Sequence, residues 1–199
     1  MAGTATDWNV AAIANTKGQI WANLAIPAGG ARLSLHTDGT PDGTANPNAK
    51  HLGMTREGAQ FLVKPKFEQF YADEFTAPIK TGLGEQEMMI SAELLQVTDT
   101  ALLELLTPGV GTKTVGTGYE QVTFGQRAIV YTSIALIFPT EADPTKFAVF
   151  HLYKGLNEGG IDIKTGRKIL SGVSLSFRGF DITSRAIADT AGSFWKQVA

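Results

Sequence analysis

Histidine and acidic side chains are the groups in this sequence that could bind a metal ion. The three histidines, His36, His51 and His151, have no short spacing between any two of them that is typical of zinc ligands. Asp38 and the pair Asp42-Gly43 are reminiscent of a calcium loop, but an acidic residue is missing at the third loop position and no glutamate closes the loop. We therefore expect ordinary loop and strand roles for these residues and no metal site.

Motifs for catalysis or cofactor binding are also missing from the sequence. There is no cysteine, which excludes disulfides, thiolate metal ligands and cysteine nucleophiles. Three short Gly-x-Gly stretches lack the Lys-Ser/Thr ending of a phosphate-binding loop, and no Gly-x-Ser-x-Gly elbow is present. Glu85, Glu87 and Glu93 alternate along one predicted strand, which is more typical of an acidic sheet face than of a catalytic pair. We predict neither an enzyme nor a bound cofactor.

The composition is that of one folded domain covering residues 1–199. Hydrophobic residues make up 43% of the chain, which is enough for a sizeable core. With 17 basic and 19 acidic residues, the formal net charge is −2, so binding that depends on many phosphate contacts is disfavoured. The longest apolar stretch, Ile129 to Phe138, is far shorter than the roughly 20 residues of a membrane helix. We expect no membrane partner and no secretory signal.

Alternation of apolar and polar residues predicts a mainly β subunit of the sandwich or barrel type. Two of the predicted strands are longer than is usual in globular proteins. Pro65 lies within one of them and predicts a sheet edge or a bulge there, because proline cannot donate to a β-ladder. The predicted strands are 19–26, Arg32–Thr37, Ala59–Ala72, Glu85–Val97, Tyr119–Phe124, Arg127–Phe138, Lys146–Tyr153 and Lys168–Ile182.

The remaining segments are predicted to be one short helix, long loops and an N-terminal arm over residues 1–16. A leucine stripe capped by Thr98 or Asp99 and ended by Pro108-Gly109 predicts a helix over Thr98–Thr107 that flanks the sheet. A Gly/Thr-rich linker is expected over Gly109–Gly118. The turn-rich segment 37–50 offers almost nothing to bury, so we expect a mobile loop.

The order of elements and two short motifs resemble a known family. Asp-Gly-Thr-Pro-Asp-Gly-Thr at 38–44 leads to Leu-Gly-Met-Thr-Arg-Glu-Gly at 52–58. Two long strands, a short helix and a closing strand over Val173–Asp181 then follow. This pattern, from about Gly18 to Asp181, resembles the tail tube (major tail) proteins of tailed bacteriophages and prophages.

The resemblance implies a structural virion protein and not an enzyme. Subunits of that family form hexameric rings that stack into a hollow tail tube, and their long strands join across subunits into an inner barrel. The implied partners are further copies of the chain, other tail proteins such as the terminator, tape measure and baseplate or tip, and DNA that passes without sequence-specific binding. The implied location is the phage tail, assembled in the host bacterial cytoplasm. The alternatives are another virion component (tail terminator, baseplate hub or head decoration protein) or a small-ligand-binding β-barrel.

The candidate assembly residues lie in two places. In the family, a long loop at the position of 37–50 packs against the neighbouring ring, so we expect this segment to act as a stacking loop that becomes ordered on stacking. The two long strands are expected to form the ring. The candidates are Thr37, Asp38, Asp42, Asn46 and Asn48 in the loop, and Lys64, Lys66, Glu85, Glu87, Ile90 and Glu93 on the strands.

Overall fold

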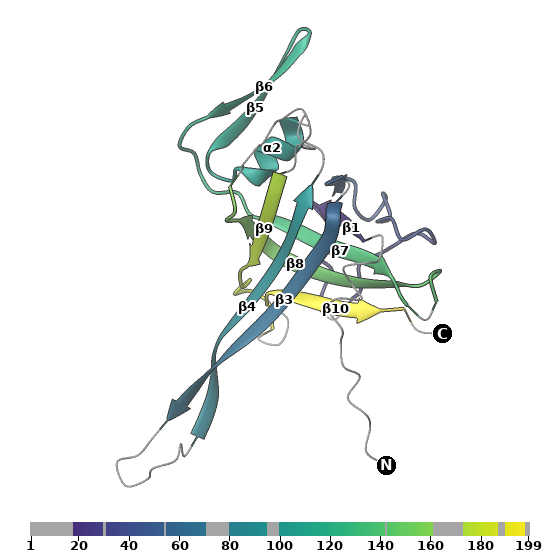
Figure 1. Ribbon diagram of the computed structural model, residues 1–199, viewed down its shortest axis with the longest axis vertical. Helices are drawn as coiled ribbons and strands as arrows, with labels where there is room; N and C mark the ends of the chain where they lie inside the picture. The colour runs from purple at the N-terminus through teal and green to yellow at the C-terminus, as the bar shows by residue number, and fades with distance from the viewer. Residues whose placement is uncertain are drawn as a thin grey trace.

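The structure of the protein is a computed structural model. It describes residues 18–29, 31–53, 55–70, 80–94, 100–141, 143–160, 173–186 and 190–197. The described residues form ten strands and one helix (Figure 1). Their bounds are β1 Gln19–Ala22, β2 Lys50–His51, β3 Thr55–Phe70, β4 Lys80–Leu94, α2 Thr100–Leu106, β5 Gly111–Gly116, β6 Tyr119–Phe124, β7 Thr132–Pro139, β8 Phe147–Asn157, β9 Val173–Gly179 and β10 Gly192–Lys196.

Eight of these strands form one antiparallel sheet, which confirms the prediction of a mainly β protein. The strand order is β2-β1-β7-β8-β9-β4-β3, and β10 pairs with β8 beside this path. Strand β8 is shared: residues 148–152 pair with β10, whereas residues 155–157 pair with β9. The β9-β4-β3 part of the sheet therefore leaves the far end of β8, and Figure 1 shows it crossing over β7 and β8. Strands β5 and β6 form a separate two-stranded sheet.

The main core lies where the two parts of the sheet cross. Ile90 on β4, Leu152 on β8 and Phe177 on β9 are fully buried in one hydrophobic cluster. Phe61 on β3 stacks on Phe150 of β8, with 4.0 Å between the ring centroids. Stacked rings and buried aliphatic side chains stabilise this crossing. Each Å² of apolar surface that is removed from water contributes about 25 cal/mol to the free energy of folding.

A second, smaller cluster covers the opposite face of β7 and β8. Leu24 and Leu33, from the segment that follows β1, pack here against Ala135, Ile137 and Val149. Strand β7 is consequently buried on both faces. This explains why its sequence is a continuous apolar run and not an alternating one.

Several predicted strand boundaries near the N-terminus are wrong. Strand β1 ends at Ala22 and not at residue 26, because Asn23 adopts a left-handed backbone with φ 58°. The predicted strand Arg32–Thr37 is instead an irregular segment with one isolated bridge, between Leu35 and Pro41. The turn residues that follow reverse the chain after a few residues, so the segment does not form regular β-sheet pairing.

The predicted linker Gly109–Gly118 is also wrong, because Gly111–Gly116 is strand β5 and forms a hairpin with β6. Gly118 at the turn has φ +82°, a conformation that glycine adopts without strain. Farther along the chain, β7 begins at Thr132 and β8 extends to Asn157. Strand β9 covers Val173–Gly179 of the longer predicted strand, of which residues 168–172 lie outside the described residues. The short strands β2 and β10 were not predicted.

The predicted helix is confirmed as α2, which packs beside the β5–β6 hairpin (Figure 1). Leu106 is fully buried, and the Thr107 hydroxyl donates to the Leu103 carbonyl at 2.8 Å where the helix ends. The side-chain amide of Asn157 donates through Nδ2 to the Leu106 carbonyl at 2.7 Å and so attaches the helix end to β8. The predicted caps, Thr98 and Asp99, lie outside the described residues. Across the described part of the chain, no helix is both long enough and apolar enough to span a membrane.

Candidate functional site

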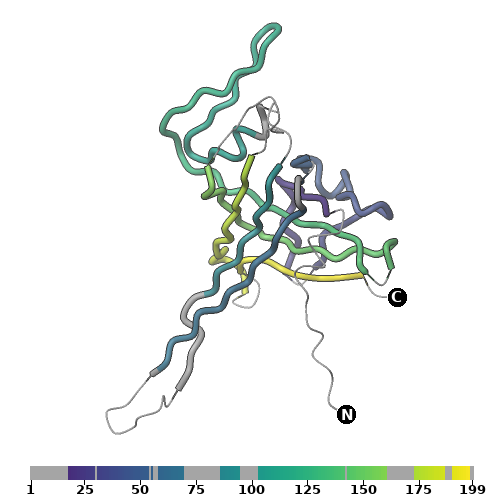
Figure 2. Tube along the Cα trace, viewed as in Figure 1, coloured from purple at the N-terminus to yellow at the C-terminus, as the bar shows by residue number. Residues whose placement is uncertain are grey.

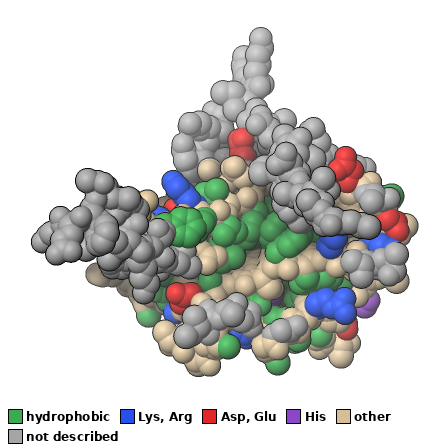
Figure 3. Space-filling model, turned by 90° about the horizontal axis from the view of Figure 1, so that it is seen from below, with side chains coloured by type: hydrophobic (Ala, Val, Ile, Leu, Met, Phe, Trp, Pro, Cys, Tyr) green, Lys and Arg blue, Asp and Glu red, His purple; other side chains and the backbone are tan. Residues whose placement is uncertain are grey.

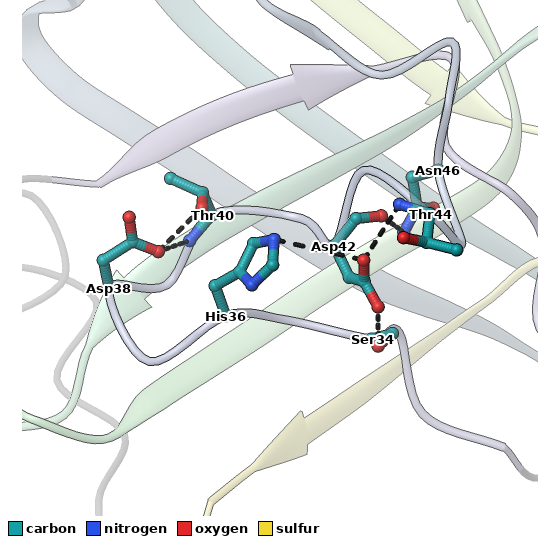
Figure 4. Close-up of polar contacts among 7 residues, drawn as sticks. All are labelled: Ser34, His36, Asp38, Thr40, Asp42, Thr44 and Asn46. Carbon is teal, nitrogen blue, oxygen red and sulfur yellow. Dashed lines mark hydrogen bonds and ion pairs between the residues drawn. The ribbon is translucent and has the colours of Figure 1, made fainter.

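The predicted stacking loop is built on two aspartate turns, shown in Figure 4. Asp38 Oδ1 accepts hydrogen bonds from the Thr40 amide at 2.9 Å and the Thr40 hydroxyl at 2.7 Å. These bonds, led by the hydroxyl of Thr40, lower the pKa of Asp38. The Asp-Gly-Thr motif therefore closes a local turn, which is the common role of aspartate before glycine.

Asp42 repeats this arrangement and connects its turn to Ser34 on the segment before the loop. Its Oδ1 accepts from the Thr44 amide at 2.9 Å, and its Oδ2 accepts from the Ser34 hydroxyl at 3.2 Å. The amide of Thr44 is the main cause that lowers the pKa of Asp42. Nε2 of His36 lies 4.0 Å from Oδ1 of Asp42 (Figure 4). No group of three or more acidic or histidine side chains within the described part of the chain is placed to hold a metal ion.

Asn46 attaches the loop to the body of the subunit. Its side chain is only 3% exposed; Oδ1 accepts from the Ala25 amide at 3.0 Å, and Nδ2 donates to the Asp42 carbonyl at 3.1 Å. Gly39, with φ +81°, lies so close to the ring of Phe147 that a Cβ would overlap with it. The expectation that this loop has almost nothing to bury is therefore wrong, because an amide side chain can be buried when its bonds are satisfied.

The other loop candidates, Thr37 and Asn48, are exposed. The structure thus places Asp38, Asp42 and Asn46 inside the loop's own hydrogen-bond network, while Thr37 and Asn48 face outward. Ordering of the loop on stacking stays a prediction.

The second group of candidates lies on the β3–β4 hairpin. Ile90 is fully buried and stands opposite Phe61 of β3 and Phe177 of β9, so it belongs to the core where β3, β4 and β9 meet. The expected apolar face of β4 is confirmed, since Met88 and Leu94 are buried with it. Glu87 and Glu93, on the alternate face, are half-buried, and Glu93 stands opposite Ser174 of β9. The structure therefore places Ile90 in the hydrophobic core of the subunit, and a role of Ile90 in ring formation stays a prediction.

The outer half of the hairpin projects away from the body, at the lower left of Figures 1 and 2. Every residue of β3 from 62 to 69 is exposed, including Phe67 at 64%. In the register, Lys64 stands opposite Glu87 and Lys66 stands opposite Glu85. Basic and acidic residues thus occupy facing positions on this arm.

Strand β3 is the last strand of the sheet, and the register shifts between Lys66 and Phe67. This confirms the prediction that Pro65 marks an edge or a bulge. Proline on an edge blunts pairing with other chains at its own position, because it has no backbone N–H to donate.

A second arm is the β5–β6 hairpin; the sequence predicted its strand β6 at Tyr119–Phe124 but not its partner β5. It extends at the opposite end of the molecule (Figure 2), and Val115, Tyr119 and Phe124 are exposed on it. Lys113 pairs with Glu120 across its strands at 2.9 Å. The alternating residues on both sides of Gly116-Thr-Gly118 are the signal that could have predicted this hairpin.

The molecule also carries apolar surface on the face seen from below in Figure 1. Seen from below, hydrophobic side chains gather in the hollowed middle of the face, and charged side chains lie mostly around them (Figure 3). The assembly candidates lie in two places: the loop attached by Asn46, and the β3–β4 hairpin, where Ile90 is in the core and Lys64 and Lys66 are on the projecting half.

Comparison with models of known protein families found no match for this chain. A search of curated proteins found no match either.

Proposed function

We propose that this protein is a structural, non-enzymatic virion protein that forms hexameric rings, which stack into the hollow tail tube of a bacteriophage. In this proposal the subunit is a β-sandwich in which β9-β4-β3 is one layer and β1-β7-β8 the other. The observation that carries the proposal is the β3–β4 hairpin, whose outer half projects from the body and whose β3 residues 62–69 are exposed on both faces.

A projecting arm of this kind is unfavourable in an isolated subunit. The edge of β3 presents backbone groups that can pair with another chain, and exposed apolar residues such as Val63 and Phe67 favour association. An isolated two-stranded hairpin is at best marginally stable in water. Pairing of β3 with a neighbouring subunit would satisfy the edge, and closure of a ring would repeat that contact without leaving a free end.

The charges on the arm support passage of DNA without binding. The formal net charge of the chain is −2, and on β3 of the arm Lys64 and Lys66 stand opposite glutamate positions in the register. A surface with facing charges of both signs gives little release of counterions from a phosphate backbone, so DNA would gain little by adhering to it.

The core argues against the small-ligand barrel. Large side chains such as Ile90, Leu152 and Phe177 are fully buried where the two parts of the sheet cross. The described pockets are open and lie at the surface, so they do not form the enclosed central cavity that a ligand-binding barrel needs. A terminator or another ring-forming tail component would share the arm and differ in whether its rings stack.

The experiment compares Phe67→Ser with Phe124→Ser. These phenylalanines are equally exposed, at 64% and 63%, but lie on different hairpins. We expect both variants to keep the melting temperature of the wild type within a few degrees, since neither side chain is buried. Sedimentation velocity and negative-stain microscopy should show that Phe67→Ser assembles poorly while Phe124→Ser assembles normally. Equal assembly of the two variants would contradict the role given to the β3–β4 arm.

A further inference from the structure

Two adjoining pockets lie beside the end of β1, away from the β3–β4 arm. They share Asn23, Lys50 and Thr132 as lining residues. The larger pocket has a volume of about 940 Å³ and is also lined by Tyr131 and Lys154. The smaller has a volume of about 180 Å³. We refer to these two adjoining pockets together as the recess.

Among the described residues that line the larger pocket, the charged ones are cations. Its described lining contains Lys50 and Lys154 but neither aspartate nor glutamate. The ammonium of Lys154 lies 4.3 Å from the centroid of the Tyr131 ring. This contact holds the ammonium over a neutral ring, so the positive charge of Lys154 can still attract an anion.

A further positive charge stands at the wall of this pocket. The guanidinium of Arg185 lies 4.5 Å from the ring centroid of Tyr153, a lining residue. Arg185 Nη1 also donates to the carbonyl of Pro27 at 2.9 Å. The arginine is thus fixed in place and adds to the positive potential at the pocket without changing position.

The smaller pocket has the same sign of charge. Arg127 forms an ion pair with Glu104 at 3.2 Å, and both line the pocket together with Lys50. Nε of Arg127 is buried and has no hydrogen-bond partner among the described residues. Two cations against one carboxylate leave an excess of one positive charge here.

Apolar side chains form the rim of the recess. Ile26 and Tyr131 line the larger pocket, Val130 lines the smaller, and all three are exposed. A recess that combines cations with an apolar rim suits a carboxylate that stands next to an aliphatic side chain, as in a peptide. A nucleic-acid backbone would instead need a longer array of cations, which a chain of net charge −2 does not supply.

We propose that this recess is a docking site for an acidic peptide segment of a partner protein. A carboxylate of the segment lies between Lys50 and Lys154, and a neighbouring aliphatic side chain packs on Ile26 and Val130. The site shares no residue with the β3–β4 arm, so it does not depend on the ring and tube assembly proposed above.

The test uses the peptide Ac-Leu-Glu-Glu-Leu-NH2, its glutamine counterpart Ac-Leu-Gln-Gln-Leu-NH2 and inorganic phosphate. Binding is followed through the NMR signals of the peptide, which report on binding to monomers and assemblies alike. We expect the glutamine peptide to bind at least about fivefold more weakly, because it lacks the charge that the lysines recognise. The Lys50→Met/Lys154→Met double variant should bind the acidic peptide about tenfold more weakly than the wild type.

The matched control is Lys113→Met/Lys146→Met, which removes two lysines that pair with Glu120 and Asp143 and line neither pocket of the recess. It should bind the peptide within about twofold of the wild type. Equal binding of the two peptides, unchanged binding by the Lys50/Lys154 variant, or no binding up to about 10 mM peptide would overturn the proposal. Phosphate that binds more tightly than the peptide would also overturn it, as the site would then serve a free anion. The Phe67→Ser variant should bind the peptide normally even if its assembly is lost.

Discussion

His151 makes the stability of this protein sensitive to acid. Its side chain is 1% exposed on β8, and its ring meets that of Tyr153 edge to face at 5.1 Å. Neither ring nitrogen has a hydrogen-bond partner among the described residues. The neighbouring positions across the sheet are Ala135 on β7 and Ser193 on β10, so neither supplies a countercharge. Burial, followed by the nearby cation Arg185, lowers the pKa of His151 from 6.5 to about 4.

The sign and size of the effect follow from linkage. In the unfolded chain the imidazole takes up a proton as the pH falls below 6.5, whereas in the folded protein His151 stays neutral until the pH approaches 4. The unfolded state is therefore favoured progressively between these two values. At about 1.4 kcal/mol for each pH unit, the free energy of unfolding falls by about 3 kcal/mol over this interval. For a chain of this length, that corresponds to roughly 6–12 °C in melting temperature.

The assay is thermal unfolding by circular dichroism from pH 7.5 to 4, for the wild type and for His151→Phe. The phenylalanine keeps an aromatic ring in the core but cannot be protonated. We expect the melting temperature of the wild type to fall by roughly 6–12 °C more than that of the variant over this range. His36→Gln, at an exposed position, controls for removal of a histidine.

Parallel pH curves for the wild type and His151→Phe would refute this reasoning. A direct NMR titration provides a second check that needs no variant. A pKa near 6.5 for His151 in the folded protein would show that its ring is not desolvated as the structure indicates.

Three further predictions concern the loop, the helix attachment and β4. Gly39→Ala should lower the free energy of unfolding, measured in urea, by about 2 kcal/mol or more, because it places a Cβ at φ +81° against Phe147. Gly43→Ala should leave this free energy nearly unchanged, because no atom lies within 4 Å of the added Cβ. Asn157→Ala should cost about 2–3 kcal/mol in the same assay, because the Leu106 carbonyl and the Ser176 amide lose their buried partner; a loss below about 0.5 kcal/mol would contradict this. Ile90→Pro should abolish folding, because β4 pairs with strands on both sides and proline removes a backbone donor; the assay is loss of the β signal in circular dichroism. Glu93→Lys should stay folded. A folded Ile90→Pro protein would contradict the central place of β4 in the sheet.

Strand β4 could be predicted because it has one buried and one less buried face. Strand β4 alternates because Ile90 packs inward while Glu87 and Glu93 lie on the other face, and this period of two is local information. Strand β6 was predicted with the bounds it has, but β5 was taken for a linker because Gly and Thr dominate its sequence. The end of β1 was misplaced because Asn23 leaves the β conformation, which the continuing apolar alternation concealed.

The candidate site was predictable only in part. The aspartate turns at Asp38 and Asp42 follow from Asp-Gly-Thr motifs that act within a few residues. The burial of Asn46 depends on the Ala25 amide, which is 21 residues away in the chain. The recess between Lys50 and Lys154 likewise requires β1 to pair with β7 and β7 to pair with β8. Contacts of this kind arise from tertiary pairing and leave no local pattern in the sequence.

The central claim, that this chain closes into rings that stack into a tube, is tested most directly by electron microscopy of the purified wild-type protein over a range of concentrations. Images averaged down the assembly axis should show six subunits around an open channel, and side views should show stacked rings of constant repeat. Monomers at every concentration, or assemblies without a central channel, would contradict the claim.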